Sequence, residues 1–250
     1  MNKPNMLRAT ATLVASLLVG QSFAAGGGGD LEPANIEPGN IASLQRGARN
    51  YMNYCSGCHS AQYVRFNTVG KHLELSEDEL VNNLMFNADK TFETIRAAMP
   101  PEDGAQWFGQ APPDMSLMAR AKGADYIYNF LKGFYLDPES PTGVDNKILA
   151  GTSMPHVLWE LQGFQKAVYA EHGDGDATSL EFEGFELVTA GSLNAEEYDE
   201  FVRDTVNFLV YIAEPIRSDR RTIGAWVIIY LIVFLVIAIM LKKQIWKDVK

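Results

Sequence analysis

The chain has 250 residues, of which 47% are apolar, and it carries a formal net charge of −10. This length allows one or two domains, and the apolar fraction is that of a folded protein. For so acidic a chain we expect no nucleic-acid partner. Both ends of the chain contain apolar runs, and these predict where the protein is located in the cell.

The first 24 residues have the layout of a secretory signal peptide. A basic start with Lys3 and Arg8 precedes the apolar run LVASLLVG and the small residues SFAA. We expect cleavage after Ala24, because the apolar run is too short to span a bilayer as an uncleaved anchor. Residues 25–216 would then form an extracytoplasmic domain in an oxidising compartment.

The first predicted helix leads into both cysteines of the chain. The segment NIASLQRGARNYMNYC has apolar residues at helical spacing, with Asn40 as a suitable N-cap. Cys55, Cys58 and His59 then form C-x-x-C-H, the attachment signature of one covalent haem c. Two thiols on one turn reach both vinyl groups of a porphyrin, and the imidazole projects toward the iron. A disulfide is the first rival; the second, a thioredoxin-type pair, needs a βαβ setting that the sequence lacks.

The rest of the extracytoplasmic part is predicted as helices joined by loops. LSEDELVNNLMF predicts a helix with Ser76 and Glu79 as a capping box, and DYIYNFLKGF predicts another. Residues 101–114 and 136–153 are rich in Gly, Pro and Asp and are predicted as loops. NAEEYDEFVRDTVNFLVYIAEP predicts a long amphipathic helix capped by Asn194. The predicted fold class is therefore all-α: a c-type cytochrome domain with long loops, plus one C-terminal transmembrane helix.

Spacing leaves the second axial iron ligand open. Methionine opposite histidine is the electron-transfer pairing, and two methionines precede a proline that fixes the backbone after them. Spacing in small c-type cytochromes favours Met99, forty residues after His59, whereas Met154 lies ninety-five residues after it and implies a larger domain. A second histidine is the alternative ligand, and the remaining histidines are His72, His156 and His172.

The stretch from Glu171 to Asp204 contains eleven acids and one base, Arg203. An acidic face near a haem would steer a basic redox partner and raise its association rate in a salt-dependent way. Ordinary solubility is the simpler explanation of the same charges.

Residues 222–241 are predicted to cross a membrane. These twenty residues carry no charge, and at 1.5 Å rise per residue a helix of this length spans about 30 Å, the thickness of the hydrocarbon core. The signal peptide places residues 25–216 on the periplasmic side of the cell inner membrane, and the lysine-rich tail, residues 242–250, in the cytoplasm. We therefore expect a single-pass protein with the lipid bilayer as one partner.

Four segments, taken in order, resemble the cytochrome c1 family: CSGCHSAQYVRF, APPDMSLMARAKGADYIYNFLKGFY, GTSMPHVL and FVRDTVNFLVYIAEP. The resemblance covers nearly the whole mature chain and implies the haem-bearing subunit of a bc1 complex, the quinol–cytochrome c oxidoreductase. In that role, electrons pass from a Rieske iron–sulfur protein through the haem to a basic cytochrome c. The resemblance also implies cytochrome b as a partner, with no catalytic group in this chain.

The resemblance assigns the iron ligand and its surroundings. Met154 matches the methionine ligand of the family, and Met99 does not. Haem contacts are implied for Pro113, Arg120, Lys122 and Tyr126. The family often has Arg-x-Arg where this chain has Arg120-Ala121-Lys122, so either Arg120 or Lys122 would pair with a haem propionate, lysine without the planar fork of arginine.

Two other functions stay open at this point. A membrane-tethered cytochrome c that donates electrons to a terminal oxidase would keep the haem and the anchor but lose cytochrome b. An enzyme or gas sensor with an open iron position would require that neither Met154 nor Met99 binds the iron.

Overall fold

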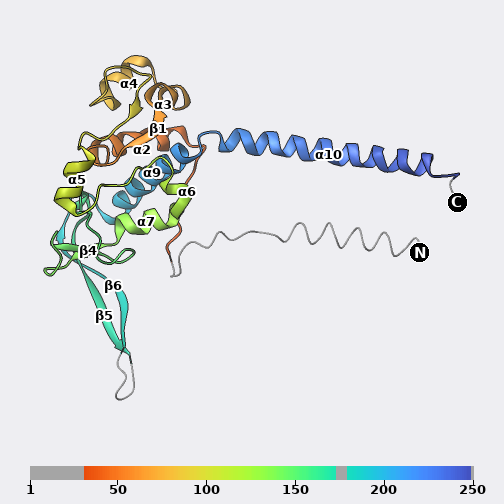
Figure 1. Cartoon of the computed structure of the whole chain (residues 1–250). Coiled ribbons are helices and arrows are strands. Elements are labelled where there is room, and N and C mark those ends of the chain that lie inside the picture. Colours follow the sequence, from red (N-terminus) through yellow and green to blue (C-terminus); the bar gives the residue numbers. More distant parts are fainter. Residues whose placement is uncertain (1–30, 173–178, 249–250) are drawn as a thin grey trace. The chain divides into compact units, whose positions relative to one another are not determined.

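The structure is a computed structural model that describes residues 31–172 and 179–248 (Figure 1). The predicted signal peptide, residues 1–24, lies outside the described residues. The described helices are α2 (Ile41–Tyr54), α3 (Phe66–His72), α4 (Glu77–Leu84), α5 (Pro101–Phe108), α6 (Met118–Lys122), α7 (Ala124–Lys132), α8 (Trp159–Gln162), α9 (Ala195–Ala213) and α10 (Arg217–Ile245). The described strands are β1 (Ala61–Arg65), β2 (Thr94–Ile95), β3 (Phe134–Leu136), β4 (Val144–Asn146), β5 (Gly163–His172) and β6 (Ser179–Ala190).

Three predicted helix starts are confirmed by their caps. The Asn40 side chain accepts a hydrogen bond from the backbone N–H of Ser43 at 3.1 Å and begins α2. Ser76 begins α4, and Asn194 begins α9, each in a full capping box with the glutamate three positions on. These caps satisfy backbone donors that a helix start leaves unpaired, so the start of each helix follows from local sequence.

The core is centred on the contact between α2 and α9, which lie side by side (Figure 1). The backbones come close at Gly47, where a Cβ would lie 2.0 Å from the carbonyl oxygen of Asp204. Buried Tyr51 and Phe208 pack across the same interface, with ring centroids 5.7 Å apart. The Asp204 carboxylate, only 4% exposed, is paired with the guanidinium of Arg46. This packing fixes the end of α2, where both cysteines follow.

The prediction of an all-α fold was wrong in part. Helices predominate, but the described residues also form three antiparallel two-stranded sheets, β1–β2, β3–β4 and β5–β6. The predicted loop 101–114 contains α5, which begins with Pro101 at its first turn, a position that needs no N–H. The predicted loop 136–153 contains β4. In β6 the sequence LEFEGFELV alternates acids with apolar residues, which is the period of a strand.

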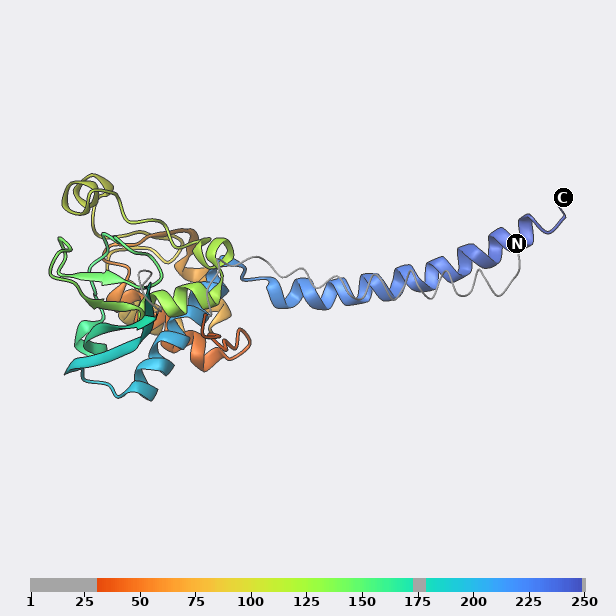
Figure 2. The same cartoon turned by 90° about the horizontal axis from the view of Figure 1, so that it is seen from below.

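The C-terminal helix α10 is long and apolar enough to cross a membrane. Its segment Asp219–Ile245 reaches a mean hydropathy of 2.9, and within residues 31–172 and 179–248 it is the one helix that meets both criteria. Figure 2 shows it as an unbroken helix. The predicted membrane segment, residues 222–241, lies inside it.

Candidate functional site

The C-x-x-C-H motif forms the turn that ends α2. Cys55 is the C-cap of the helix, and the backbone N–H groups of Cys58 and His59 both donate to its carbonyl oxygen, at 3.1 and 2.8 Å. Both cysteines are free thiols. Burial, with a smaller contribution from Cys58, raises the pKa of Cys55 to about 12, so this thiol is protonated at neutral pH. The turn thus brings two thiols and one imidazole to the same wall of a cavity.

Two hydrogen bonds hold His59, one on its imidazole and one on its backbone. Its Nδ1 lies 2.8 Å from the carbonyl oxygen of Pro113, and the hydroxyl of Tyr51 donates to its backbone carbonyl at 2.8 Å. Burial lowers the pKa of His59, while the Pro113 carbonyl and the charge of Asp114 act in the opposite direction. The neutral ring therefore donates from Nδ1, and Nε2 keeps the lone pair that a metal ion requires.

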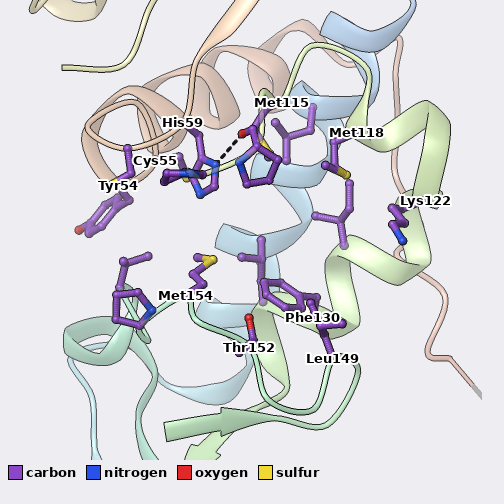
Figure 3. Close-up of a pocket in the computed structure, with 18 of the residues that line it drawn as sticks. Tyr54, Cys55, His59, Met115, Met118, Lys122, Phe130, Leu149, Thr152 and Met154 are labelled. Carbon is purple, nitrogen blue, oxygen red and sulfur yellow. Dashed lines mark hydrogen bonds between the residues drawn. The ribbon is translucent and has the colours of Figure 1, made fainter. Parts of the chain in front are cut away.

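The cavity beside His59 has a volume of about 330 Å³. Its walls are mostly aliphatic and aromatic side chains, among them Phe130 of α7 and Leu149 of the β4–α8 connection. Figure 3 shows Met154 reaching toward His59 from the opposite side of the cavity. An imidazole and a thioether therefore face one apolar space, although ninety-five residues separate them in the sequence.

The structure brings seven of the eight predicted site residues to this cavity. Besides the motif and Met154, they are Pro113, Lys122 and Tyr126. The ammonium of Lys122 lies 5.3 Å from the ring centroid of Tyr126, as a cation over an aromatic face. Arg120 does not line the cavity. Of the two cations in this helix, Lys122 is the one placed beside the site.

The other ligand candidates do not line the cavity. Met99 packs against α5. The Nδ1 of His72 lies 2.9 Å from the hydroxyl oxygen of Tyr211 in the core. His156 is 6% exposed, and burial lowers its pKa to about 4. The side chain of His172 lies outside the described residues.

Several wall residues were not predicted from the sequence. Met115 precedes α6 and Met118 begins it, and both line the cavity. Phe130 and Leu131 come from α7, on whose buried stripe Ile127 also lies. The helical spacing of the α7 residues was a usable signal for a buried face, but it does not indicate what that face covers.

The residues of the cavity fit a covalently bound haem c. Two thiols stand one turn apart, and an oriented imidazole and a methionine sulfur occupy opposite walls. The volume falls within the range of ligand and cofactor pockets, which are apolar with few polar groups. A cationic side chain, Lys122, is placed where a carboxylate could be bound.

Comparisons with known proteins show one family and one relative with a different name. The sequence pattern of the Cytochrome C1 family matches residues 36–179 and 185–249. A cytochrome c1 from Allochromatium vinosum is 45% identical over 228 residues, which cover 91% of this chain and 93% of the relative. A protein named ammonia monooxygenase gamma subunit, from Nitrosomonas europaea, is 38% identical and covers 88% of each chain. A more distant relative from Bradyrhizobium diazoefficiens, named cytochrome b/c1, is 23% identical over 82% of this chain and 33% of its own length.

Proposed function

The chain belongs to the cytochrome c1 family, and from that membership we propose that it takes electrons from a Rieske iron–sulfur protein and delivers them to a cytochrome c. The family supports the coarser role on which this path rests, that of haem-bearing subunit of a bc1 complex. The relative named cytochrome b/c1 supports cytochrome b as a partner in that complex.

One observation carries the proposal: His59 and Met154 face each other across an apolar cavity that also contains both thiols. Cys55 and Cys58 would hold haem c through two thioethers. When bound, haem c supplies a reversible one-electron couple, and a histidine–methionine pair raises its potential. The Pro113 carbonyl orients the His59 ring so that Nε2 is free to bind iron.

The walls of the cavity are mostly apolar, and one cation is placed to bind the polar edge of the cofactor. We assign the propionate contact to Lys122 with Tyr126, because both line the cavity and Arg120 does not. A lysine binds a carboxylate as a point charge, without the bidentate geometry of arginine. Exchange of Lys122 for arginine should therefore be tolerated, and exchange for glutamate should not.

The membrane segment supports a single-pass protein anchored by α10. We place the haem domain, residues 25–216, on the periplasmic side of the cell inner membrane, and residues 242–250 in the cytoplasm. The support for this orientation is the predicted signal peptide and the oxidising compartment that covalent haem attachment suits. A protease added to intact spheroplasts should therefore cleave the haem domain and leave a tag on the C-terminal tail intact.

Purification of the tagged full-length chain from its own membranes in mild detergent tests the proposed function. We expect cytochrome b and a Rieske protein in the same complex, with quinol-dependent reduction of added cytochrome c. A chain that purifies without cytochrome b, yet reduces a terminal oxidase, would instead be a membrane-tethered cytochrome c.

The relative named ammonia monooxygenase gamma subunit favours testing a second function, that of a subunit in an oxygenase. The two functions differ in their partners, because a bc1 subunit requires cytochrome b. Copurification with an ammonia-oxidising activity, without quinol–cytochrome c reductase activity, would favour the oxygenase. The opposite result would favour the bc1 complex.

A further inference from the structure

Met154 lies in a stretch without regular secondary structure, between β4 and α8. A methionine on such a stretch needs support from elsewhere if its sulfur is to keep one position. Upstream, the carboxylate of Asp145 on β4 accepts a hydrogen bond from the backbone N–H of Gly151 at 2.7 Å. Downstream, the nearest buried polar side chain is His156, two residues after the methionine.

The ring of His156 is held between two phenylalanines. It stacks on Phe134 of β3, with ring centroids 5.0 Å apart and planes 10° from parallel. Phe164 of β5 meets it edge to face, with centroids 6.4 Å apart. Neither ring nitrogen of His156 makes a hydrogen bond with a described residue. The backbone of Gly163 lies close enough to oppose the effect of burial on the pKa of His156, but it does not meet hydrogen-bond geometry. The close contacts of the side chain are therefore those of its ring with Phe134 and Phe164.

The two strands that supply this clamp are tied together. The Gln165 amide donates to the carbonyl oxygens of Lys132 and Phe134, at 2.9 and 2.7 Å. Because these bonds join β5 to β3 and to the end of α7 just before it, Phe134 and Phe164 keep a fixed relative position.

Proline transmits the position of the ring to the methionine. Pro155 lies between His156 and Met154, and its own pyrrolidine ring fixes its φ angle. Met154 is restricted in turn, because a residue before proline avoids the helical region. Few soft dihedral angles therefore separate the clamped ring from the Met154 sulfur.

We propose that His156 is the positioning residue for Met154: its ring, clamped between Phe134 and Phe164, fixes the turn that presents the methionine sulfur to the cavity. This inference rests on the proposed iron ligation by Met154. His156, which does not line the cavity, would thus affect how Met154 binds the iron.

Three substitutions in the full-length, haem-loaded protein test the inference. His156→Phe keeps an aromatic ring, His156→Gln keeps polar atoms without a ring, and His156→Ala removes both. The readouts are the long-wavelength band of methionine-ligated ferric haem and the reduction potential. We expect the phenylalanine variant to keep both near the wild-type values. We expect the glutamine and alanine variants to lose most of the band and to have a lower reduction potential. The potential should fall by about 59 mV for each tenfold loss in preference for the reduced state.

Phe182→Ala is the matched control. Phe182 belongs to the same hairpin, where it packs edge to face on Phe185 at 4.9 Å and contacts none of the three rings of the clamp. Among the described residues, its one ring contact with the β4–α8 stretch is the ammonium of Lys147, 4.4 Å from its ring centroid and seven residues before Met154. We expect this variant to lower the unfolding temperature without changing the band or the potential. If it changes them as much as His156→Ala does, the effect is one of general stability and the inference is overturned.

The remaining outcomes separate the inference from the function on which it rests. A wild-type protein without the methionine band would overturn the proposed ligation, and the inference with it. A wild-type band that survives in His156→Ala would overturn the inference alone. Rescue by glutamine but not by phenylalanine would also overturn it, because the role would then belong to the polar atoms.

Discussion

The Nδ1 atom of His59 lies 2.8 Å from the carbonyl oxygen of Pro113. The loop that carries this carbonyl is fixed by the next residue, Asp114. One carboxylate oxygen of Asp114 accepts from the backbone N–H of Gln62 at 2.9 Å, and the other from that of Ser116 at 2.8 Å. A residue that makes no hydrogen bond to the imidazole therefore sets the direction of the bond that orients it.

From this relationship we predict that Asp114→Asn raises the reduction potential of the haem-loaded protein. The change removes a negative charge near the site and one of two acceptors that hold the loop, so the Nδ1 hydrogen bond weakens. We expect a rise of roughly 20–60 mV, where 59 mV corresponds to a tenfold change for a one-electron couple. Redox titration measures it, and Asp78→Asn on the exposed start of α4 is the control. A potential that stays constant or falls would contradict this prediction.

A second prediction concerns the methionine on the iron. Met154→Leu should abolish the long-wavelength band of the ferric protein and lower the potential, because the cavity loses the sulfur opposite His59. Met99→Leu should leave both nearly unchanged, since Met99 packs beside α5 and does not line the cavity. Absorption spectra of the two variants decide between them, and the reverse pattern would exclude Met154.

What the sequence predicts well is local chemistry. The caps at Asn40, Ser76 and Asn194 each depend on residues within one turn, so their pattern was sufficient. The C-x-x-C-H motif is equally local, and its role in haem attachment stays a prediction. The assignment of Met154 as iron ligand depends on tertiary structure, because a segment ninety-five residues after His59 must fold back to the cavity at the end of α2. Spacing alone favoured Met99, and only the family resemblance pointed to Met154.

The β5–β6 hairpin shows why the remaining part was missed. Its strand β6 alternates Glu181 and Glu183 with apolar residues, but the acids of this stretch were interpreted only as steering a basic partner or as ordinary solubility. Strand pairing joins residues distant in sequence, such as Phe164 with Thr189, so no local pattern specifies the partner. The clamp on His156 depends on that pairing and on β3, which is why the sequence identified the histidine only as a ligand candidate.

The contact of α2 with α9 predicts a sharp sensitivity at Gly47. Gly47→Ala would place a Cβ 2.0 Å from the carbonyl oxygen of Asp204 and 2.8 Å from the Cβ of Phe208, so the helices must move apart. We expect a loss of about 3 kcal/mol or more in the free energy of unfolding, or roughly 6–12 °C in the unfolding temperature. Gly39→Ala, with open space around its Cβ, should change it little. Equal unfolding temperatures in thermal scans of the two variants would refute the close approach.

Tyr198 predicts how stability depends on alkaline pH. Its hydroxyl donates to the carbonyl oxygen of Leu131 at 3.0 Å, and burial, helped by the charge of Asp199, raises its pKa. Above pH 10 the unfolded chain loses this proton while the folded chain keeps it. The contribution of Tyr198 to stability is therefore complete below pH 10 and is lost as pH rises, by up to about 1.4 kcal/mol per pH unit.

Removal of the hydroxyl should reduce that slope. Tyr198→Phe should cost about 1 kcal/mol at pH 8, where the hydrogen bond to Leu131 is lost. Between pH 10 and 12 it should lose stability more slowly than the wild type. Chemical unfolding followed by circular dichroism measures the loss at pH 8 and the slope above pH 10. Tyr63 is 77% exposed, so Tyr63→Phe is a control that should leave the slope unchanged. An unchanged slope in Tyr198→Phe would show that another group causes the alkaline loss.

The acidic stretch from Glu171 to Asp204 is not a uniform face. Four of its acids are in ion pairs: Asp199 with Lys132, Glu186 with Lys166, and Glu200 and Asp204 with Arg46. Residues 174 and 176 lie outside the described residues. Among the described exposed acids, Glu183 and Glu196 make no ion pair with a described residue, so their charges are available to act at a distance.

The last prediction follows from this division. The double change Glu183→Gln and Glu196→Gln should slow the second-order reaction with a basic cytochrome c at low salt about two- to fivefold, because less negative potential attracts the partner. The difference in rate between this variant and the wild type should vanish above roughly 0.3 M salt, where the Debye length is below about 10 Å and the charges no longer attract a distant partner. Glu77→Gln with Asp78→Asn on α4 removes the same net charge elsewhere and should slow the reaction less. Equal effects from both pairs in stopped-flow measurements would mean that net charge, rather than the β6–α9 region, guides the partner.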